Sequence, residues 1–597
     1  MTSLDLGLIG NCSYGALIDR RGRIVWACLP RFDSDPIFCS LLGGDDPEAG
    51  FFEVELIGCE RSEQEYVPNT AVLRTRLYDA SGNGIEITDF APRFKMFGRM
   101  FRPMMLVRRI RPILGHPIIR VRLRPTYDYG AHRPETTRGS NHLRYLVPGV
   151  TLRLTTNLPI SIITEELKYL LEEPVDLILG SDESMLQRVE DVAREFEDHT
   201  LDYWREWSRY LSIPFEWQDA VIRAAITLKL CAYEETGGIV AAMTTSVPES
   251  HGTERNWDYR LCWLRDSYFT VHALNRLGAT RTMEDYIRFL VNLVATNQDR
   301  NGGFRLQPLY SILGHARPDE RIVPSLPGYR GNGPVRIGNA AYSQLQYDIY
   351  GAVVLAVTQA FYDRRLARPG DQGLFERLEE IGEQAWAVHD QPDAGPWELR
   401  NTTQVHTFSS LMCWAACDRL AKIAGTLRLE DRAGLWSQRA EAIREKIETR
   451  AWNPEVGAFT QAWGGRDLDA SMLLMGELGF LQGDDPRFVS TVEAIGRELK
   501  RGPYVFRYKA PDDFGEPENA FNICTFWYID ALARLGRKEE ARVLFENMLS
   551  RRNHLGLLSE HLDTETGEQW GNFPQTYSMV GLISCAMRLS KSWEAAF

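Results

Sequence analysis

The pattern of apolar and polar positions changes once along the chain, near Ser181. Before that point, short runs alternate with period two, and turn clusters rich in Gly, Asn and Pro separate them. Many short alternating strands between such turns predict an antiparallel β-sandwich. The runs lie at 51–57, 71–78, 84–90, 105–110, 118–124, 145–147 and 150–154.

After residue 183 the apolar positions recur with the period of an α-helix. Residues 184–214 predict a helical linker, and 215–597 predicts about twelve helices, the number expected for an (α/α)6 toroid. In such a barrel six inner helices line a cup, and loops at one end carry the functional residues. The division is therefore 1–183 β-sandwich, 184–214 linker and 215–597 (α/α)6 domain. The helices are expected near 217–234, 262–277, 282–296, 340–363, 373–388, 407–424, 430–450, 467–478, 486–499, 517–535, 538–549 and 574–590.

Composition excludes some partners. A chain of 597 residues is too long for one core, and 44% hydrophobic with 25% charged residues is ordinary for a soluble enzyme. The net charge of −13 argues against nucleic acid, which needs a basic face. Aromatic residues make up 11%, which suits a cleft for sugar rings, although core packing is the more common role of any single tryptophan.

The cysteines and the N-terminus predict a compartment. The ten cysteines are scattered, with no Cys-x-x-Cys pair, as is typical of free buried thiols. No leader-like segment opens the chain, and no apolar run approaches the roughly 20 residues that span a bilayer. We therefore expect a cytoplasmic protein with no membrane partner. No metal or nucleotide motif is found, so we expect no metal and no cofactor.

Two carboxylates are the main candidates for chemistry. Glu398 follows the turn 393–396 and the indole of Trp397, and Glu560 ends the segment 556–560. Cleavage of a glycosidic bond needs one carboxyl group to protonate the leaving oxygen and a second to activate water or attack the sugar. For either residue the alternative is an exposed glutamate on a loop.

A third segment, 255–266, combines aromatic, cationic and anionic side chains and leads into a predicted helix. Arg265 and Asp266 are suited to hold neighbouring sugar hydroxyls, because the guanidinium donates in a fixed fork and the carboxylate accepts. They are equally suited to a structural salt bridge. Tyr259 and Trp263 would line the pocket or belong to the core.

These motifs together resemble glycoside hydrolase family 15, the glucoamylase, trehalase and glucodextranase group, over nearly the whole chain. The opening 9–34, with Pro30-Arg31-Phe32-Asp33-Ser34, is similar to that of bacterial members, and 328–341 is similar to the trehalase-like subgroup. The resemblance implies Glu398 as general acid, Glu560 as general base and an inverting mechanism. It further implies a set of substrate-binding residues: Tyr259, Trp263, Arg265, Asp266, Arg336, Trp397, Arg400, Arg507 and Tyr577.

The family resemblance predicts an exo-acting α-glucoside hydrolase. Trehalose is the first expected substrate, and malto- or isomalto-oligosaccharides are the alternative. A non-catalytic carbohydrate-binding protein on the same scaffold is the second alternative, against which the presence of both Glu398 and Glu560 argues. Homo-oligomerisation is left open by the sequence.

Overall fold

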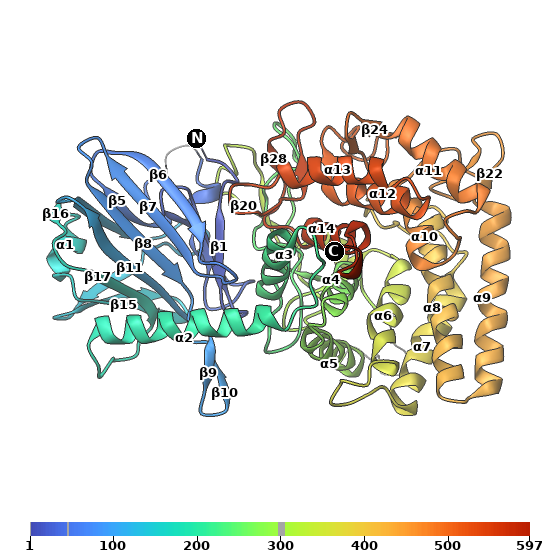
Figure 1. Ribbon diagram of the computed structural model, residues 1–597, viewed down its shortest axis with the longest axis horizontal. Coiled ribbons are helices and arrows are strands. Elements are labelled where there is room, and N and C mark those ends of the chain that lie inside the picture. The colour runs from blue at the N-terminus through green and yellow to red at the C-terminus, as the bar shows by residue number, and fades with distance from the viewer. Residues whose placement is uncertain (1, 45–46, 297–304, 597) are drawn as a thin grey trace.

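The computed structural model describes residues 2–44, 47–296 and 305–596 and has two parts. Strands fill the first part and helices the second, and the long helix α2 (Val189–Arg209) lies along the strand-rich part (Figure 1). The combination of β-sandwich and helical toroid that the sequence predicts is confirmed. Among the described residues, no helix combines the length and apolar character needed to cross a membrane.

The N-terminal part is a sandwich of two sheets whose strand pairs are all antiparallel. The seven-stranded sheet contains β1 (Gly7–Gly10), β2 (Gly15–Ile18), β3 (Ile24–Cys28), β4 (Pro36–Phe38), β5 (Phe51–Leu56), β12 (Ile118–Arg124) and β16 (Tyr169–Leu170). The eight-stranded sheet contains β6 (Cys59–Tyr66), β7 (Leu73–Asp79), β8 (Gly84–Phe90), β11 (Met105–Leu114), β13 (Glu135–Arg138), β14 (His142–Val147), β15 (Val150–Thr156) and β17 (Val175–Ser181). A hairpin of β9 (Phe94–Met96) and β10 (Arg99–Phe101) projects from it, and α1 is Ile160–Thr164.

Strand β12 illustrates how alternation builds the sandwich. Its apolar residues Ile119, Val121 and Leu123 are buried in the core between the sheets. Its arginines point to the other face, where Arg120 and Arg122 lie opposite glutamates of β5 in the strand register and form ion pairs with them. Opposite charges directly across a strand pair stabilise the pairing modestly.

Helix α2 covers the outer face of the eight-stranded sheet. Its apolar stripe packs on that sheet, and among its contacts Val192 and Ala193 lie in one cluster with Val107 of β11. Its buried Glu197 accepts a hydrogen bond of 2.6 Å from Arg109 of β11. We keep 1–183, 184–214 and 215–597 as the proposed division, with α2 fixed to the sandwich.

In the described part of the chain, twelve α-helices follow α2. The inner ring closes: α4 packs on α6, α6 on α8, α8 on the turn before α10, that turn on α12, α12 on α14, and α14 on α4. The helices are α3 (Gln218–Leu230), α4 (Leu264–Arg276), α5 (Arg281–Thr296), α6 (Asp348–Thr358), α7 (Gln372–Val388), α8 (Thr407–Thr426), α9 (Glu430–Arg450), α10 (Leu474–Leu478), α11 (Pro486–Glu498), α12 (Asn522–Arg534), α13 (Lys538–Ser550) and α14 (Thr576–Leu589).

Short elements connect the helices. The 3-10 turns are Ser40–Leu42, Ala340–Ser343, Gln359–Phe361, Ala470–Leu473 and Glu594–Ala596. The small strands are β18 (Cys262–Trp263), β19 (Leu309–Tyr310), β20 (Arg321–Val323), β21 (Val335–Ile337), β22 (Trp452–Asn453), β23 (Ala458–Phe459), β24 (Lys500–Arg501), β25 (Tyr504–Val505), β26 (Ala520–Phe521), β27 (His561–Leu562) and β28 (Gln569–Trp570).

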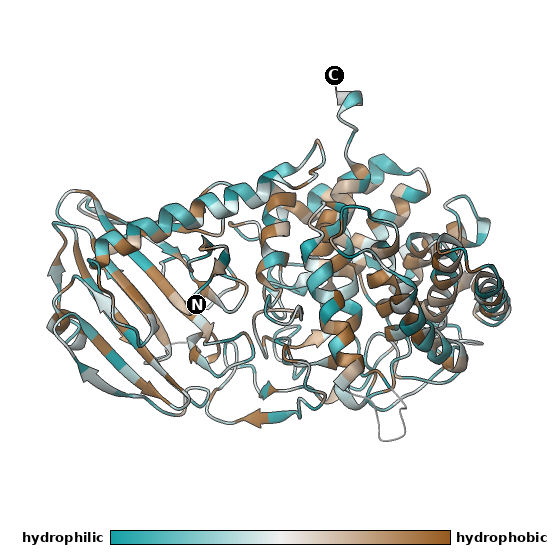
Figure 2. Ribbon diagram, turned by 90° about the horizontal axis from the view of Figure 1, so that it is seen from below, coloured by the Kyte–Doolittle hydropathy of each residue, from teal (hydrophilic) through white to brown (hydrophobic). Residues whose placement is uncertain are grey.

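The inner helices are buried over most of their surface, and polar residues gather on the outer ones, as the hydropathy colouring of Figure 2 shows for the outermost helix α9. The sequence suggests one helix over 340–363, but the structure interrupts it before α6. The interruption lets Gln346 donate to the Glu398 carboxylate instead of continuing a helix.

Candidate active site

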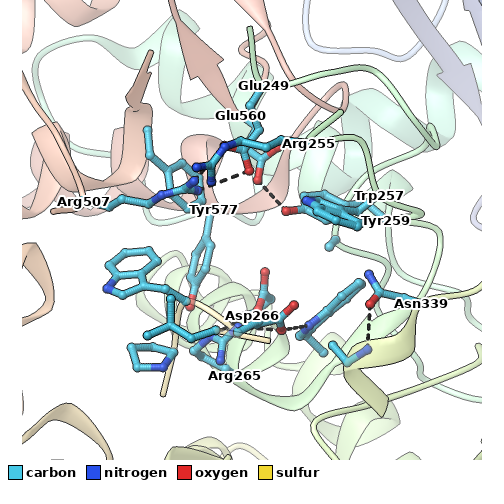
Figure 3. Close-up of a pocket in the computed structure, with 18 of the residues that line it drawn as sticks. Glu249, Arg255, Trp257, Tyr259, Arg265, Asp266, Asn339, Arg507, Glu560 and Tyr577 are labelled. Carbon is cyan, nitrogen blue, oxygen red and sulfur yellow. Dashed lines mark hydrogen bonds and ion pairs between the residues drawn. The ribbon is translucent and has the colours of Figure 1, made fainter. Parts of the chain in front are cut away.

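One cavity of about 960 Å³, its mouth included, lies at the end of the barrel where the inner helices begin. Arg265 and Asp266 lie on the first turn of α4, Phe408 on the first turn of α8 and Tyr577 on the first turn of α14. Ten of the eleven residues expected from the sequence line this cavity: Tyr259, Trp263, Arg265, Asp266, Trp397, Glu398, Arg400, Arg507, Glu560 and Tyr577. Figure 3 labels six of them: Tyr259, Arg265, Asp266, Arg507, Glu560 and Tyr577.

Glu560 is buried on one wall of the cavity, directly before β27. Its Oε1 accepts a 2.6 Å hydrogen bond from the Tyr259 hydroxyl, and its Oε2 lies 3.4 Å from Nδ1 of His561. A Cβ on Gly571 would lie 2.7 Å from the Cβ of Glu560, and this glycine also has a φ of +79°. A side chain at position 571 would therefore displace the carboxylate.

Glu398 lies on a tight turn between α7 and α8, with a φ of +61° that is unfavourable for a residue other than glycine. Its Oε1 accepts hydrogen bonds from Trp263 Nε1 at 2.5 Å, Gln346 Nε2 at 3.3 Å and Arg265 Nη2 at 3.4 Å. These bonds all go to Oε1, so Oε2 is the oxygen that remains for a substrate. Strain of this kind is typical of functional residues that the surrounding structure holds in place.

Trp397, next to Glu398, is fixed from behind. Its Nε1 donates to Asp469 at 2.8 Å, and Asp469 also caps the 3-10 turn before α10 by accepting from Ser471 N. Burial raises the pKa of Asp469 to about 6.

Two aromatic rings connect the carboxylates. Trp263, which donates to Glu398, meets Tyr259, which donates to Glu560, edge to face with ring centroids 5.3 Å apart. The two aromatic side chains therefore form one wall of the cavity, with a carboxylate at each end of that wall. A sugar ring that packs against such a wall would have its scissile bond between the two carboxyl groups.

Arg265 and Asp266 form the floor. Arg265 donates to Gln346 at 3.0 Å and to Asp348 at 3.3 Å, and its Nε lies 3.7 Å from Asp266 Oδ2. Burial, with a further contribution from the charge of Glu398, raises the pKa of Asp266 to about 7 although Arg265 opposes the rise.

Two buried polar atoms of the floor have no hydrogen-bond partner among the described residues: Asp266 Oδ2 and the Tyr577 hydroxyl. Unpaired buried polar groups are costly, and a sugar hydroxyl would satisfy both.

Two ion pairs line the side of the cavity that lies opposite Arg265 and Asp266. Both oxygens of Glu249 accept from the Arg507 guanidinium, at 2.8 and 3.2 Å, and Arg255 forms a two-bond pair with Asp512. Burial acts to raise the pKa of Glu249, but the charge of Arg507 and neighbouring cations outweighs it and holds the pKa below its usual range. Figure 3 shows Arg507 and Arg255 across the cavity from Arg265.

Arg336 is the expected residue that the structure does not bring to the cavity. Its guanidinium donates to the carbonyls of Glu254 and Asn256 and lies 4.7 Å from the Trp257 ring. Trp257 does line the cavity, and Arg400 lies 4.2 Å over the same ring at the mouth. Arg336 therefore supports the wall from behind, because its Nη1 is held by the two backbone carbonyls and its Nε lies 3.6 Å from the Glu320 carboxylate.

Several residues that line the cavity are not among those expected from the sequence. Arg255 and Trp257 are two of them, and their place in the segment 255–266 is a signal that points to them. Glu249 has no aromatic or glycine-rich neighbourhood, and only its pairing with Arg507 reveals it.

Among the described residues, one group of side chains is close enough to hold a metal ion: Glu249, Glu560 and His561, whose ligand atoms lie within 4.8 Å of one another. Glu249 already binds the Arg507 guanidinium with both oxygens, and Glu560 Oε1 already accepts from Tyr259. A cation there would be repelled by Arg507, so the arrangement fits a hydrogen-bonded base better than a metal site.

Comparisons with known proteins identify the family. Residues 217–587 match the model of glycosyl hydrolases family 15, and residues 4–166 match a trehalase-like N-terminal domain. The chain belongs to glycosyl hydrolases family 15. The family 15 match spans the helical barrel with the residues that line the cavity, and the trehalase-like match spans most of the β-sandwich.

Several family relatives are similar over more than nine-tenths of their length. The trehalase of Thermoplasma volcanium is 31% identical, with 98% of this chain and 93% of that protein covered. The trehalase of Mycolicibacterium smegmatis is 32% identical over 99% and 92%, and trehalase 1 of Sulfolobus acidocaldarius 32% over 97% of each. A bacterial glucoamylase solved with acarbose shares the fold, with a TM-score of 0.70 at 13% identity, covering 98% of this chain and 94% of the other.

Proposed function

We propose that this protein is a trehalase that hydrolyses α,α-trehalose with inversion at one anomeric carbon. The observation that carries the proposal is the convergence of Glu398 and Glu560 on one cavity, on either side of the Trp263–Tyr259 pair. Relatives named trehalase, of which more than nine-tenths aligns with this chain, support trehalose over other α-glucosides.

In the proposed reaction Glu398 gives its proton to the glycosidic oxygen. Glu560 takes a proton from a water molecule that attacks the anomeric carbon on the opposite face of the ring. The carbon–oxygen bond breaks, so one glucose leaves in its original α configuration. The other receives the hydroxyl of water and becomes β-glucose.

The other lining residues would bind the two sugar rings. Arg265, Asp266 and the Tyr577 hydroxyl offer a fixed donor fork, together with two polar atoms that have no hydrogen-bond partner in the described part of the chain, to the hydroxyls of the glucose that is attacked. Arg507 and Arg255, across the cavity, would meet the leaving glucose. Both guanidiniums are held by carboxylates, so they donate without rearranging.

We further propose that the enzyme works in a reducing compartment such as the cytoplasm. All ten cysteines are free thiols, and nine of them are buried. Buried single thiols behave as small apolar residues and do not need oxidation for stability.

A glucose-release screen over trehalose, maltose, isomaltose, kojibiose, nigerose and dextrin tests the proposal. We expect the highest kcat/KM for trehalose, with Glu398→Gln and Glu560→Gln as controls for contaminating glucosidases. Preference for maltose or isomaltose would overturn the substrate assignment, and no release from any substrate would overturn the proposed activity.

A further inference from the structure

The backbone that carries Tyr259 into the cavity sends the next side chain, Arg260, the opposite way into the β-sandwich. Arg260 is only 2% exposed. Its guanidinium donates to the Tyr129 hydroxyl at 2.9 Å, to the Ser34 carbonyl at 3.0 Å and to both oxygens of Asp258 at 2.8 and 2.9 Å. Each nitrogen of the guanidinium donates a hydrogen bond, so the side chain is held in one orientation and restrains the backbone of Arg260.

The receiving site is built from two separate parts of the sandwich. One is the segment 28–34, which contributes the Ser34 carbonyl and the Cys28 sulfur, 3.5 Å from Arg260 Nη1. The other is Tyr129, whose backbone has a φ of +51° and follows Asp128 with a φ of +50°. The Asp35 carboxylate accepts from the backbone N–H groups of both residues. Two successive non-glycine residues in the left-handed region are strained, and such strain persists only where surrounding contacts hold it, as the Asp35 carboxylate does here.

We propose that the β-sandwich is a positioning device for the catalytic base, and that Arg260 is the positioning residue that connects the two domains. Arg260 anchors the backbone between Asp258 and the sandwich. That anchor directs the Tyr259 hydroxyl at Glu560 Oε1, 2.6 Å away. Asp258 Oδ2 also accepts from Gly338 N at 3.1 Å, so the anchored segment holds the neighbouring loop as well.

This inference rests on the proposed role of Glu560 as the base. A contact that only holds the two domains together would change stability and leave turnover unaffected. The Arg260 contact is expected to change turnover, and chiefly through Tyr259. A double-mutant cycle between Tyr129 and Tyr259 separates these two cases.

The test combines Tyr129→Phe, Tyr259→Phe and the double variant, in the full-length chain with trehalose. Tyr129→Phe removes a buried hydrogen bond to a charged group, so we expect kcat to fall about tenfold with KM changed less than about twofold. In the Tyr259→Phe background the same change should lower kcat by less than about twofold. Arg223→Gln is the matched control, because Arg223 of α3 binds the Thr70 carbonyl of the sandwich at 2.8 Å and shares no hydrogen bond with this anchor. We expect it to lower the unfolding temperature and leave kcat unchanged.

An unchanged kcat in Tyr129→Phe, or equal losses in both backgrounds, would overturn the proposal. If trehalose proves not to be the substrate, the cycle is run on the best glucoside from the screen. A readout independent of activity is a crystal structure of Tyr129→Phe and of Arg260→Lys. We expect the Tyr259 hydroxyl to move away from Glu560 in both, and an intact 2.6 Å contact in both would overturn the positioning role even if Glu560 were the base.

Discussion

Replacing Asp266 by Asn should stabilise the protein at neutral pH and not at acidic pH. The side chain is buried, and its pKa is raised from 3.8 to about 7 by burial and by the nearby charges of Glu398 and Glu560, against the opposing charge of Arg265. The unfolded chain binds a proton at this site only below about pH 4. The folded chain holds it up to about pH 7, so the folded state loses stability as the pH rises between these values.

The size of the effect follows from the same shift. Each pKa unit corresponds to about 1.4 kcal/mol, so the raised pKa lowers the free energy of unfolding by roughly 4 kcal/mol above pH 8. About 2 to 3 kcal/mol of this decrease occurs between pH 5 and pH 8. The amide of the Asp266→Asn variant has no proton to release and would escape that loss, although it would bind sugar hydroxyls less well than the carboxylate.

Urea unfolding of wild type and Asp266→Asn at pH 5, 6, 7 and 8 measures this difference. We expect the free energy of unfolding of the variant, relative to wild type, to increase by about 2 to 3 kcal/mol from pH 5 to pH 8. Asp485→Asn is the control. Hydrogen bonding to Arg487 is the largest cause that lowers the pKa of Asp485, and arginine keeps its charge throughout, so Asp485 is ionised in both states over this range. A difference for Asp266→Asn that stays constant across the four pH values would refute the reasoning.

Three further outcomes follow from the contacts in the cavity. Glu398→Gln and Glu560→Gln should each lower kcat at least about 10²-fold with little change in unfolding temperature, and near-full turnover in either would remove its assigned role. Trp263→Phe deletes the 2.5 Å donor to Glu398, so kcat should fall about tenfold in steady-state assays; an unaltered kcat would mean that this bond does not orient the acid. Arg507→Gln leaves Glu249 buried without its cation and should cost about 3–5 kcal/mol in urea unfolding and raise KM; a cost below about 1 kcal/mol would contradict a buried pair.

The helical part could be predicted well because its apolar stripes have one clear period. Each of the twelve expected segments overlaps one observed helix. Strand β12 was equally clear, because it faces the core on one side and solvent on the other. Strands β1 to β3 were not expected, since they are buried on both faces and show no alternation. In β3, Trp26 packs in the cluster shared with the helical part, whereas Ile24 packs between the two sheets.

The apolar pattern does not predict the edge strand β6 either, because this strand has too few apolar residues, whereas β1 to β3 are buried throughout. Its sequence is almost wholly polar, and its order comes from backbone pairing with β7. No hydrophobic pattern marks such a strand, because its stability is not carried by its own side chains.

Local motifs located the carboxylates, but contacts distant in sequence completed the site. Glu398 and Glu560 stand out by their neighbours, whereas Glu249 becomes significant only through Arg507, 258 residues further on. The family motif around Arg336 predicts a substrate contact, but a motif does not show on which side of the cavity wall a side chain lies. Arg260 shows the same limit, since its partners belong to the other domain.

Proton NMR of the first glucose released from trehalose, recorded before mutarotation, tests the central claim most directly. Attack by water on one anomeric carbon inverts it, while the other glucose leaves unchanged, so we expect equal initial signals of α- and β-glucose. If Glu560 were instead a nucleophile that forms a covalent glycosyl intermediate, both products would appear as α-glucose. Pure initial α-glucose would contradict the assignment of Glu560 as a general base, and equal amounts of the two anomers would support it.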